Sequence, residues 1–158
     1  MNTPVINQPD VLEEVTRQFC RYEKALTTND IKVLDELFWH SPHTVRLGAG
    51  ENLYGIEQIQ AFRAGRPSAN LERVLQNTVI TTYGDDFAVC STEFTRSTTD
   101  KIGRQQQSWV RFPPGCPLAA VHPSPTSCSP ATVPAGPVAR RLRSRALRRP
   151  GHRAPLPA

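Results

Sequence analysis

LERVLQNTVITTYGDDFAVCSTEFTR, residues 71–96, is the stretch that decides the fold class. Residues 71–83 are rich in β-formers, and Gly84-Asp85 is a turn signal. Residues 86–96 alternate, so that one strand face carries Ala88, Cys90, Thr92, Phe94 and Arg96 and the other carries Phe87, Val89, Ser91, Glu93 and Thr95. The pattern predicts two antiparallel strands joined by a tight turn.

A further strand is expected after this pair, over residues 104–112, RQQQSWVRF. One of its faces carries Gln105, Gln107, Trp109 and Arg111, and one face must look into the interior. Trp109 favours the first face, and Gln107 can then contact a ligand. A Trp109 that faces a dimer partner is the alternative.

The residues before the strands predict helices. Val11, Val15, Phe19, Tyr22 and Leu26 recur at helical spacing after Pro9, with Asp10 as the expected N-cap. A second helix begins after Asn29-Asp30 and ends near Ser41-Pro42, a short strand follows over residues 44–47, and a third helix ends at Gly65 and Pro67. Helices first and an antiparallel meander afterwards indicate an α+β domain over residues 1–112.

Composition divides the 158 residues into two parts. Residues 1–112 carry 12 Lys and Arg against 14 Asp and Glu, whereas residues 113–158 carry seven Arg and no acid. The second part also holds 11 of the 15 prolines and no aromatic residue, so we expect a disordered tail. The arginine-rich stretch over residues 140–149 lacks interleaved aromatic residues, so nucleic acid is not the expected partner.

Other functional classes find little support in the sequence. It has no apolar run of membrane length and no secretory signal pattern, so a cytoplasmic location and no membrane partner are expected. The four cysteines share no CxxC spacing, which favours reduced thiols over disulfides or zinc. His40 and His43 flank a Ser-Pro bend without a nearby third ligand, so no metal is expected. No GxSxG, GxGxxG or P-loop occurs, and no cofactor is expected.

Nine sequence blocks run in order along residues 1–112. They are the NxPxVLxEV motif from Asn7 to Val15, RYE (Arg21–Glu23), ND (Asn29, Asp30), LDELFW (Leu34–Trp39), SPHTVR (Ser41–Arg46), GENLYG (Gly50–Gly55), FRAxRP (Phe62–Pro67), TVITTYG (Thr78–Gly84) and GRQxQxWVR (Gly103–Arg111). Through these blocks the chain resembles the AtzH-like family, which includes the oxalurate-catabolism protein HpxZ. That family belongs to the nuclear-transport-factor-2-like (SnoaL-like) superfamily.

The resemblance implies a cystatin-like cone, in which a curved antiparallel sheet encloses the N-terminal helices and pairs with a second copy as a homodimer. It also implies a role in the catabolism of nitrogen heterocycles and ureides, such as cyanuric acid and oxalurate. The expected partner is a small anionic ureide-type molecule. Decarboxylation, or related lyase-type C–N chemistry on a dicarboxylated urea compound, is the expected task.

The chain departs from the family pattern in two places. Relatives usually carry an acid at the position of His40. They also end with a strand that reads roughly GWRIVAAHVS, whereas residues 115–124 read GCPLAAVHPS. Pro117 and Pro123 remove ladder donors, so a central strand is not expected there. We hypothesise that residues from about 114 onward come from a shifted reading frame.

Tyr22 and Arg46 are the expected catalytic residues. Tyr22 lies on the apolar helix face, from which its hydroxyl can donate a proton, although a core tyrosine bonded to a carbonyl is the alternative. Arg46 offers a planar fork for a substrate carboxylate, and the alternative is an ion pair with Glu93 or another acid. Arg46 would hold the carboxylate while Tyr22 protonates the atom on which charge develops, without a metal.

Further residues are expected to bind substrate. Trp39 and His43 lie where the second helix leads into the strand, and Tyr54 is expected at the cavity mouth or as a staple ahead of the third helix. Arg63 can attract anions or stabilise a helix C-terminus. Glu93 is the mid-strand acid that an isomerase-type base would need. The alternative to an enzyme is a non-catalytic ligand-binding or accessory subunit of an amidohydrolase partner.

Overall fold

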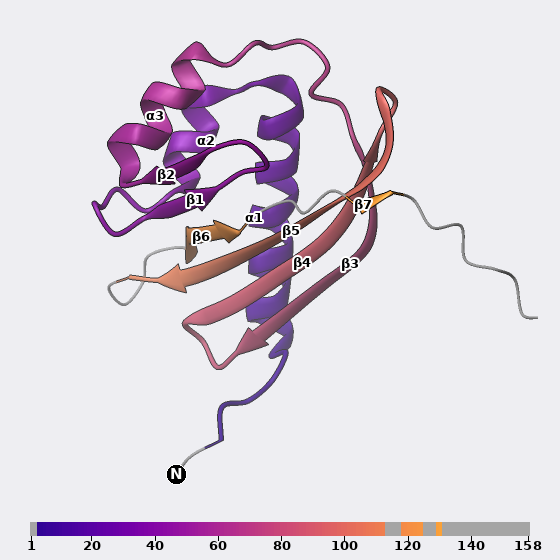
Figure 1. Cartoon of the computed structure of the whole chain (residues 1–158). Coiled ribbons are helices and arrows are strands. Elements are labelled where there is room, and N and C mark those ends of the chain that lie inside the picture. Colours follow the sequence, from indigo (N-terminus) through magenta and orange to yellow (C-terminus); the bar gives the residue numbers. More distant parts are fainter. Residues whose placement is uncertain (1–2, 113–117, 125–128, 131–158) are drawn as a thin grey trace, which may run out of the picture.

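The computed structural model describes residues 3–112, 118–124 and 129–130. In these residues the elements are α1 (Pro9–Thr28), α2 (Ile31–Leu37), β1 (Val45–Leu47), β2 (Asn52–Tyr54), α3 (Ile56–Gly65), β3 (Val74–Tyr83), β4 (Phe87–Arg96), β5 (Thr99–Arg111), β6 (Leu118–Ser124) and β7 (Ser129–Pro130) (Figure 1). None of the helices in this part of the chain has the length and apolarity that a membrane crossing needs. The order of helices and strands confirms the α+β prediction.

The long helix α1 buries the face that the sequence predicted, which includes Val15 and Phe19. Its start differs from the prediction, because Gln8 and not Asp10 is the N-cap residue. Pro9 occupies the first turn, where its missing N–H and restricted φ suit a helix start. Asp10 therefore lies inside the first turn, where its negative charge interacts favourably with the helix dipole.

Two residues set the sharp turn between α1 and α2. Asn29 ends α1 in the left-handed conformation with a φ of 56°. Asp30 is the N-cap of α2, and its Oδ1 accepts a hydrogen bond of 3.1 Å from the backbone N–H of Val33. The turn places α2 against α1, and α3 packs against α2.

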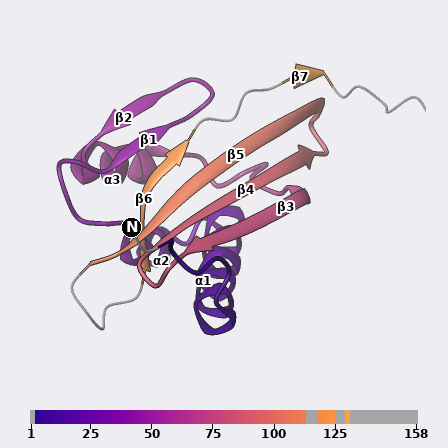
Figure 2. The same ribbon diagram turned by 90° about the horizontal axis from the view of Figure 1, so that it is seen from below.

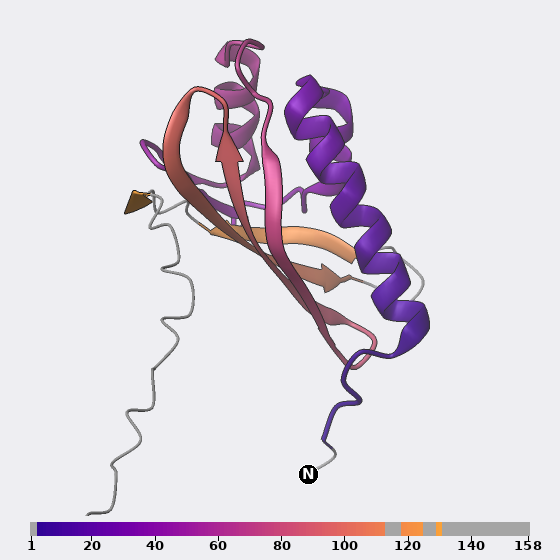
Figure 3. The same cartoon turned by 90° about the vertical axis from the view of Figure 1, so that its right-hand side faces the viewer.

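The strands β3, β4, β5 and β6 form an antiparallel sheet in that order, which twists around α1 (Figures 2 and 3). The predicted alternation holds in β4, where Ala88, Cys90, Thr92 and Phe94 are buried and Phe87 is exposed. The β1–β2 hairpin and α3 lie together at one end of the molecule (Figure 1). The helices therefore occupy the concave side of a curved sheet, as a cone requires.

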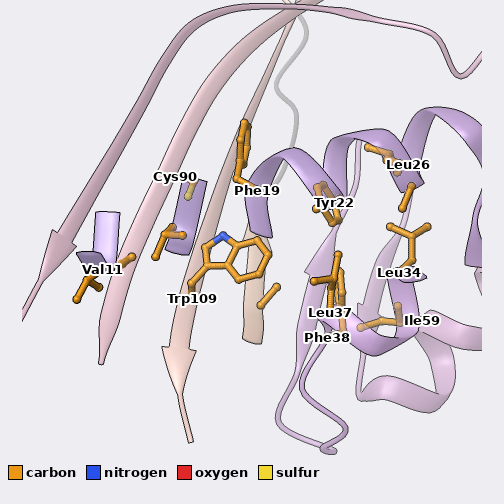
Figure 4. Close-up of a cluster of buried hydrophobic side chains, with 14 residues drawn as sticks. Val11, Phe19, Tyr22, Leu26, Leu34, Leu37, Phe38, Ile59, Cys90 and Trp109 are labelled. Atoms are coloured by element: carbon orange, nitrogen blue, oxygen red, sulfur yellow. The ribbon is translucent and has the colours of Figure 1, made fainter. Parts of the chain in front are cut away.

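The core confirms the inward face of β5. Trp109 and Gln107 are both fully buried within the chain, so the alternative of a Trp109 facing a dimer partner is wrong. Figure 4 shows Trp109 among buried side chains that include Phe19 of α1 and Cys90 of β4. The Trp109 indole N–H donates to the Gln107 side-chain oxygen at 3.1 Å, so two polar atoms of the core satisfy each other.

The expectation of a disordered tail after residue 112 is wrong for β6, although β6 lies at the end of the strand path and is not a central strand. β6 pairs with β5 from Leu118 opposite Arg111 to Ser124 opposite Gln106, and Pro123 lies within it. A missing donor is tolerated because β6 is the last strand of this path and Pro123 lies next to its end. The backbone of Ala120 also accepts a hydrogen bond of 3.1 Å from the Trp39 N–H. Apart from β6 and β7, the expected tail lies outside the described residues.

Candidate functional site

A cavity of 270 Å³ lies between α1, the β1–β2 hairpin, α3 and the far end of the β4–β5 hairpin. Its lining comprises Tyr22, Leu26, Arg46, Leu47, Gly48, Ala49, Glu51, Phe62, Arg66, Leu71, Arg73, Phe94, Arg96, Thr99, Lys101, Gly103 and Gln105. Tyr22 and Arg46, which lie 24 positions apart in the chain, thus reach one cavity. The volume is below the ~300–1,000 Å³ of pockets that hold drug-sized ligands, so the cavity suits a small molecule.

Tyr22 reaches the cavity from the buried face of α1. Its ring stacks on Phe38 at 6.1 Å between ring centroids, and only 3% of the residue is exposed. Tyr22 also belongs to the buried core, as the alternative of a core tyrosine expects, although no hydrogen bond from its hydroxyl to a carbonyl is found among the described residues. Figure 4 shows Tyr22 on α1 next to Phe38. A ring held this firmly presents its hydroxyl in a constant position.

Arg46 stands on β1 and is half-buried. Its Nη1 donates to the Glu51 carboxylate at 2.5 Å, and its guanidinium carbon lies 5.0 Å from the centroid of the Phe62 ring. Glu51 folds over Gly48, where an added Cβ would lie 2.1 Å from a Glu51 carboxylate oxygen. The ion pair considered for Arg46 therefore forms with Glu51, and the guanidinium is held at the cavity wall by an acid from the same hairpin.

Arg73 was not anticipated by the sequence analysis. Its Nε and Nη2 donate to both carboxylate oxygens of Glu23 at 2.6–2.9 Å, and Gln105 bonds to both residues at 3.0 Å. Its guanidinium carbon also lies 4.4 Å from the centroid of the Phe94 ring. One signal in the sequence could have indicated such a cation. Glu23 lies beside Tyr22 on the buried side of α1, and a buried carboxylate needs a cationic partner.

Arg66 is a further cation of the lining. Its Nη2 donates to the Leu26 carbonyl oxygen at 3.1 Å and to the Asn29 side-chain oxygen at 3.0 Å. Its Nε is buried without a hydrogen-bond partner. Burial lowers the pKa of Arg66, and the positive charge of Arg46 lowers this pKa further.

Arg63 is buried away from the cavity lining. It forms an ion pair of 2.6 Å with Asp35 and lies 4.0 Å from the centroid of the Phe38 ring. Burial lowers the pKa of Arg63, while the hydrogen bond to Asp35 acts in the opposite direction. Arg63 therefore lies outside the cavity lining, where it pairs with Asp35 in the contact between α2 and α3.

Glu93 and Gln107 are not brought to the cavity. Glu93 lies on the outer face of β4, where it pairs with Arg104 at 3.3 Å and accepts a hydrogen bond of 2.9 Å from Asn77. Gln107 points into the core beside Trp109, and its Nε2 is buried without a partner. Neither residue, nor Trp109, lines the cavity.

Trp39, His43 and Tyr54 lie on a different surface. Trp39 stacks on Phe112 at 4.3 Å and on the exposed His43 at 6.3 Å between ring centroids. Tyr54 is 58% exposed and lines a separate surface hollow with His40. Within residues 38–46, Arg46 thus lines the cavity, whereas His40 and His43 lie outside it.

In the described part of the chain, no three His, Cys, Asp or Glu side chains gather as a metal site requires. The prediction of a metal-free enzyme stays a prediction. The cavity lining holds five cationic side chains, those of Arg46, Arg66, Arg73, Arg96 and Lys101, against the one carboxylate of Glu51. Such a lining attracts small anions.

Comparisons with known proteins agree with this architecture. The AtzH-like family model matches residues 4–127. A solved protein with unknown function from Pectobacterium atrosepticum is 63% identical, with a TM-score of 0.74, over 78% of this chain and 94% of its own. A cystatin-like fold protein from Burkholderia xenovorans is 41% identical, with a TM-score of 0.77, over 82% of this chain and 99% of its own.

A third solved structure extends the likeness of fold. A nuclear-transport-factor-2-like superfamily protein from Salmonella enterica is 23% identical, with a TM-score of 0.59, over 81% of this chain and 96% of its own. No match to a curated protein was found. The predicted cystatin-like, nuclear-transport-factor-2-like fold class is confirmed.

Proposed function

The chain belongs to the AtzH-like family, and from this premise we propose that it is a small enzyme that removes a carboxyl group from a carboxylated urea compound. The observation that carries the proposal is the cavity itself, which Tyr22 lines together with several cationic side chains. A tyrosine hydroxyl can transfer a proton, and guanidinium groups bind carboxylates. Decarboxylation at nitrogen can use both groups, one to hold the carboxylate and one to supply the proton.

Arg46 has the role of orienting the substrate. Glu51 occupies its Nη1, so the guanidinium keeps further N–H donors with which to bind a substrate carboxylate. Contact with the Phe62 ring restricts the side chain further, which reduces the entropy lost on binding. A carboxylate bound there lies in the same small cavity as the Tyr22 hydroxyl.

Tyr22 has the role of proton donor. As the bond between the urea nitrogen and the carboxylate carbon breaks, its electron pair stays on nitrogen and CO2 leaves. The Tyr22 hydroxyl donates a proton to that nitrogen, and the resulting phenolate recovers a proton from water. A negative charge on Tyr22 interacts favourably with the positive charges of Arg63 and Arg66.

The test is CO2 release by the purified full chain from a panel of carboxylated ureas that includes 1,3-dicarboxyurea and oxalurate. Tyr22→Phe keeps the ring against Phe38 and removes the proton donor, so kcat is expected to fall roughly 10²- to 10⁴-fold with KM little changed. Arg46→Ala is expected chiefly to raise KM. Tyr83→Phe, at an exposed tyrosine outside the cavity, is the matched control and is expected to retain full activity.

Two outcomes decide against the proposal. If a carboxylated urea is turned over and Tyr22→Phe retains the full rate, Tyr22 is not the proton donor. If no member of the panel is turned over and an amidohydrolase co-purifies with the chain, the accessory-subunit alternative replaces the enzyme.

A further inference from the structure

Gln105 is a polar residue of the cavity lining to which the proposed reaction gives no role. It lies on the inward face of β5, at the point where the lining gives way to the core, because Gly103 lines the cavity and Gln107 does not. Only 8% of Gln105 is exposed. A buried amide needs hydrogen-bond partners, and a ligand can supply those that the chain does not.

Charged neighbours fix the orientation of the Gln105 amide. Its Oε1 accepts a hydrogen bond of 3.0 Å from Arg73 Nη2, and its Nε2 donates one of 3.0 Å to Glu23 Oε1. A guanidinium can only donate and a carboxylate can only accept, so the reverse orientation of the amide would lose both bonds. Glu23 and Arg73 are themselves joined by an ion pair of 2.6 Å. These partners therefore hold the Gln105 amide in one orientation.

One N–H group of this amide remains available. An amide nitrogen carries two N–H groups, and the bond to Glu23 uses one of them. In the described part of the chain no acceptor is found for the second N–H group. It is a neutral donor in a lining whose cationic side chains include those of Arg46 and Arg66. The guanidinium groups suit carboxylates, whereas a neutral donor suits the oxygen of a neutral carbonyl group.

We infer that Gln105 contacts the substrate, and that its second amide N–H donates a hydrogen bond to the carbonyl oxygen of the substrate's urea group. The inference rests on the proposed function, because it concerns the same cavity and the same reaction. Gln105, Tyr22 and Arg46 all line this small cavity. One urea compound can therefore contact all three, with its carboxylate on Arg46 and its carbonyl oxygen on Gln105.

The hydrogen bond from Gln105 becomes stronger during the reaction. When the bond between the urea nitrogen and the carboxylate carbon breaks, the electron pair left on nitrogen is shared with the adjacent carbonyl group, whose oxygen becomes more negative. Gln105 stabilises this oxygen and transfers no proton, while Tyr22 donates the proton to nitrogen. An amide that is already oriented towards developing charge needs no rearrangement as the charge appears.

The experiment compares two dicarboxylates of equal length that differ only at the central carbon. Glutarate has a methylene group there, whereas 3-oxoglutarate has a carbonyl group, as 1,3-dicarboxyurea does. Binding of each freshly dissolved ligand to the full chain is measured by isothermal titration calorimetry. The unchanged chain is expected to bind 3-oxoglutarate roughly 3- to 10-fold more tightly than glutarate, the effect of one added neutral hydrogen bond. Gln105→Met keeps the length of the side chain and removes the amide, so this variant is expected to bind the two ligands equally.

Gln107→Met is the matched control. Gln107 is a buried glutamine on the same face of β5 and does not line the cavity, so this variant is expected to retain the preference for 3-oxoglutarate. A second readout is the carbon NMR signal of the central carbonyl of bound 3-oxoglutarate. This signal is expected to move downfield in the unchanged chain and in Gln107→Met, and to stay near its free position in Gln105→Met. If the chain turns over a carboxylated urea, Gln105→Met is also expected to lower kcat roughly 10²-fold.

A purely structural role for Gln105, as the link between Glu23 and Arg73, predicts that Gln105→Met weakens both ligands by the same factor. That result overturns the inference. It is also overturned if the unchanged chain binds neither ligand, or binds the two with equal affinity. A preference for 3-oxoglutarate that depends on Gln105, in a chain that releases no CO2 from any carboxylated urea, supports the inference and rejects the proposed reaction.

Discussion

Replacing Glu23 with Gln tests whether the buried pair of Glu23 and Arg73 holds the cavity wall together. The two side chains are 10% and 3% exposed, and Gln105 bonds to both. Glu23→Gln keeps the shape and removes the charge, so Arg73 becomes a buried cation without a carboxylate partner. Removing one member of a buried ion pair costs about 3–5 kcal/mol. For a domain of this size, that corresponds to a decrease in Tm of roughly 10–20 °C.

The assay is urea unfolding followed by circular dichroism and by tryptophan fluorescence, with coincident curves as the check on two-state behaviour. Glu13→Gln is the control, because its side chain is 81% exposed and its contact with Arg17 is 4.0 Å long. The control is expected to change stability by about 0.5 kcal/mol or less. The double variant Glu23→Leu with Arg73→Met replaces the pair by apolar side chains and is expected to recover most of the lost stability.

The reasoning about the pair is refuted if Glu23→Gln costs less than about 1 kcal/mol, because an unpaired buried cation costs more than that. It is equally refuted if the double variant is as unstable as the single variant, since the loss then does not come from an unpaired charge.

Two further predictions concern β4 and β5. Burial raises the pKa of the Cys90 thiol to about 12, so native protein at pH 8 is expected to react with iodoacetamide at the exposed Cys20 and not at Cys90, as read by peptide mass spectrometry. The pKa of the thiol in the unfolded chain is 9.0, so the stability that depends on a neutral Cys90 is present below about pH 9 and is lost as the pH rises towards 12. An equal loss of stability with rising pH in Cys90→Ala would contradict this. Gly103→Ala would place a Cβ 2.3 Å from the Phe94 ring, so a loss of about 1–3 kcal/mol in urea unfolding is expected, whereas Gly50→Ala, with open space around it, should be close to neutral.

Local patterns predicted the secondary structure well wherever neighbours in the chain decide the conformation. The apolar spacing of α1 and the alternation in β4 report directly which side of each element is buried. Asp30 was recognisable as a cap because its side chain bonds to an N–H only three residues further along. The start of α1 was misplaced by two residues because Pro9 at the first turn outweighs the capping preference of Asp10.

The sequence analysis missed β6 because a proline disrupts a strand only when a neighbouring strand needs the missing backbone donor. Pro123 removes a backbone donor, and this excludes a strand only where a partner on that side needs the donor. β6 ends the path of the sheet, and its other contacts run to β1 and to the segment of Phe38 and Trp39. That arrangement is a property of the tertiary structure.

The order of amino acids was enough to predict the fold class and two of the residues that line the cavity, Tyr22 and Arg46, since each lies in a local pattern that turns its side chain inward. Which charged side chains pair with one another depends on the three-dimensional arrangement of the elements. Arg73 pairs with Glu23, which is 50 positions away in the chain, and Glu93 pairs with Arg104 on the outer face of the sheet. Arg66 meets the end of α1 and remains without a described acid partner. An ion pair acts through space over a few ångströms, whereas sequence patterns report only which face of an element a side chain occupies.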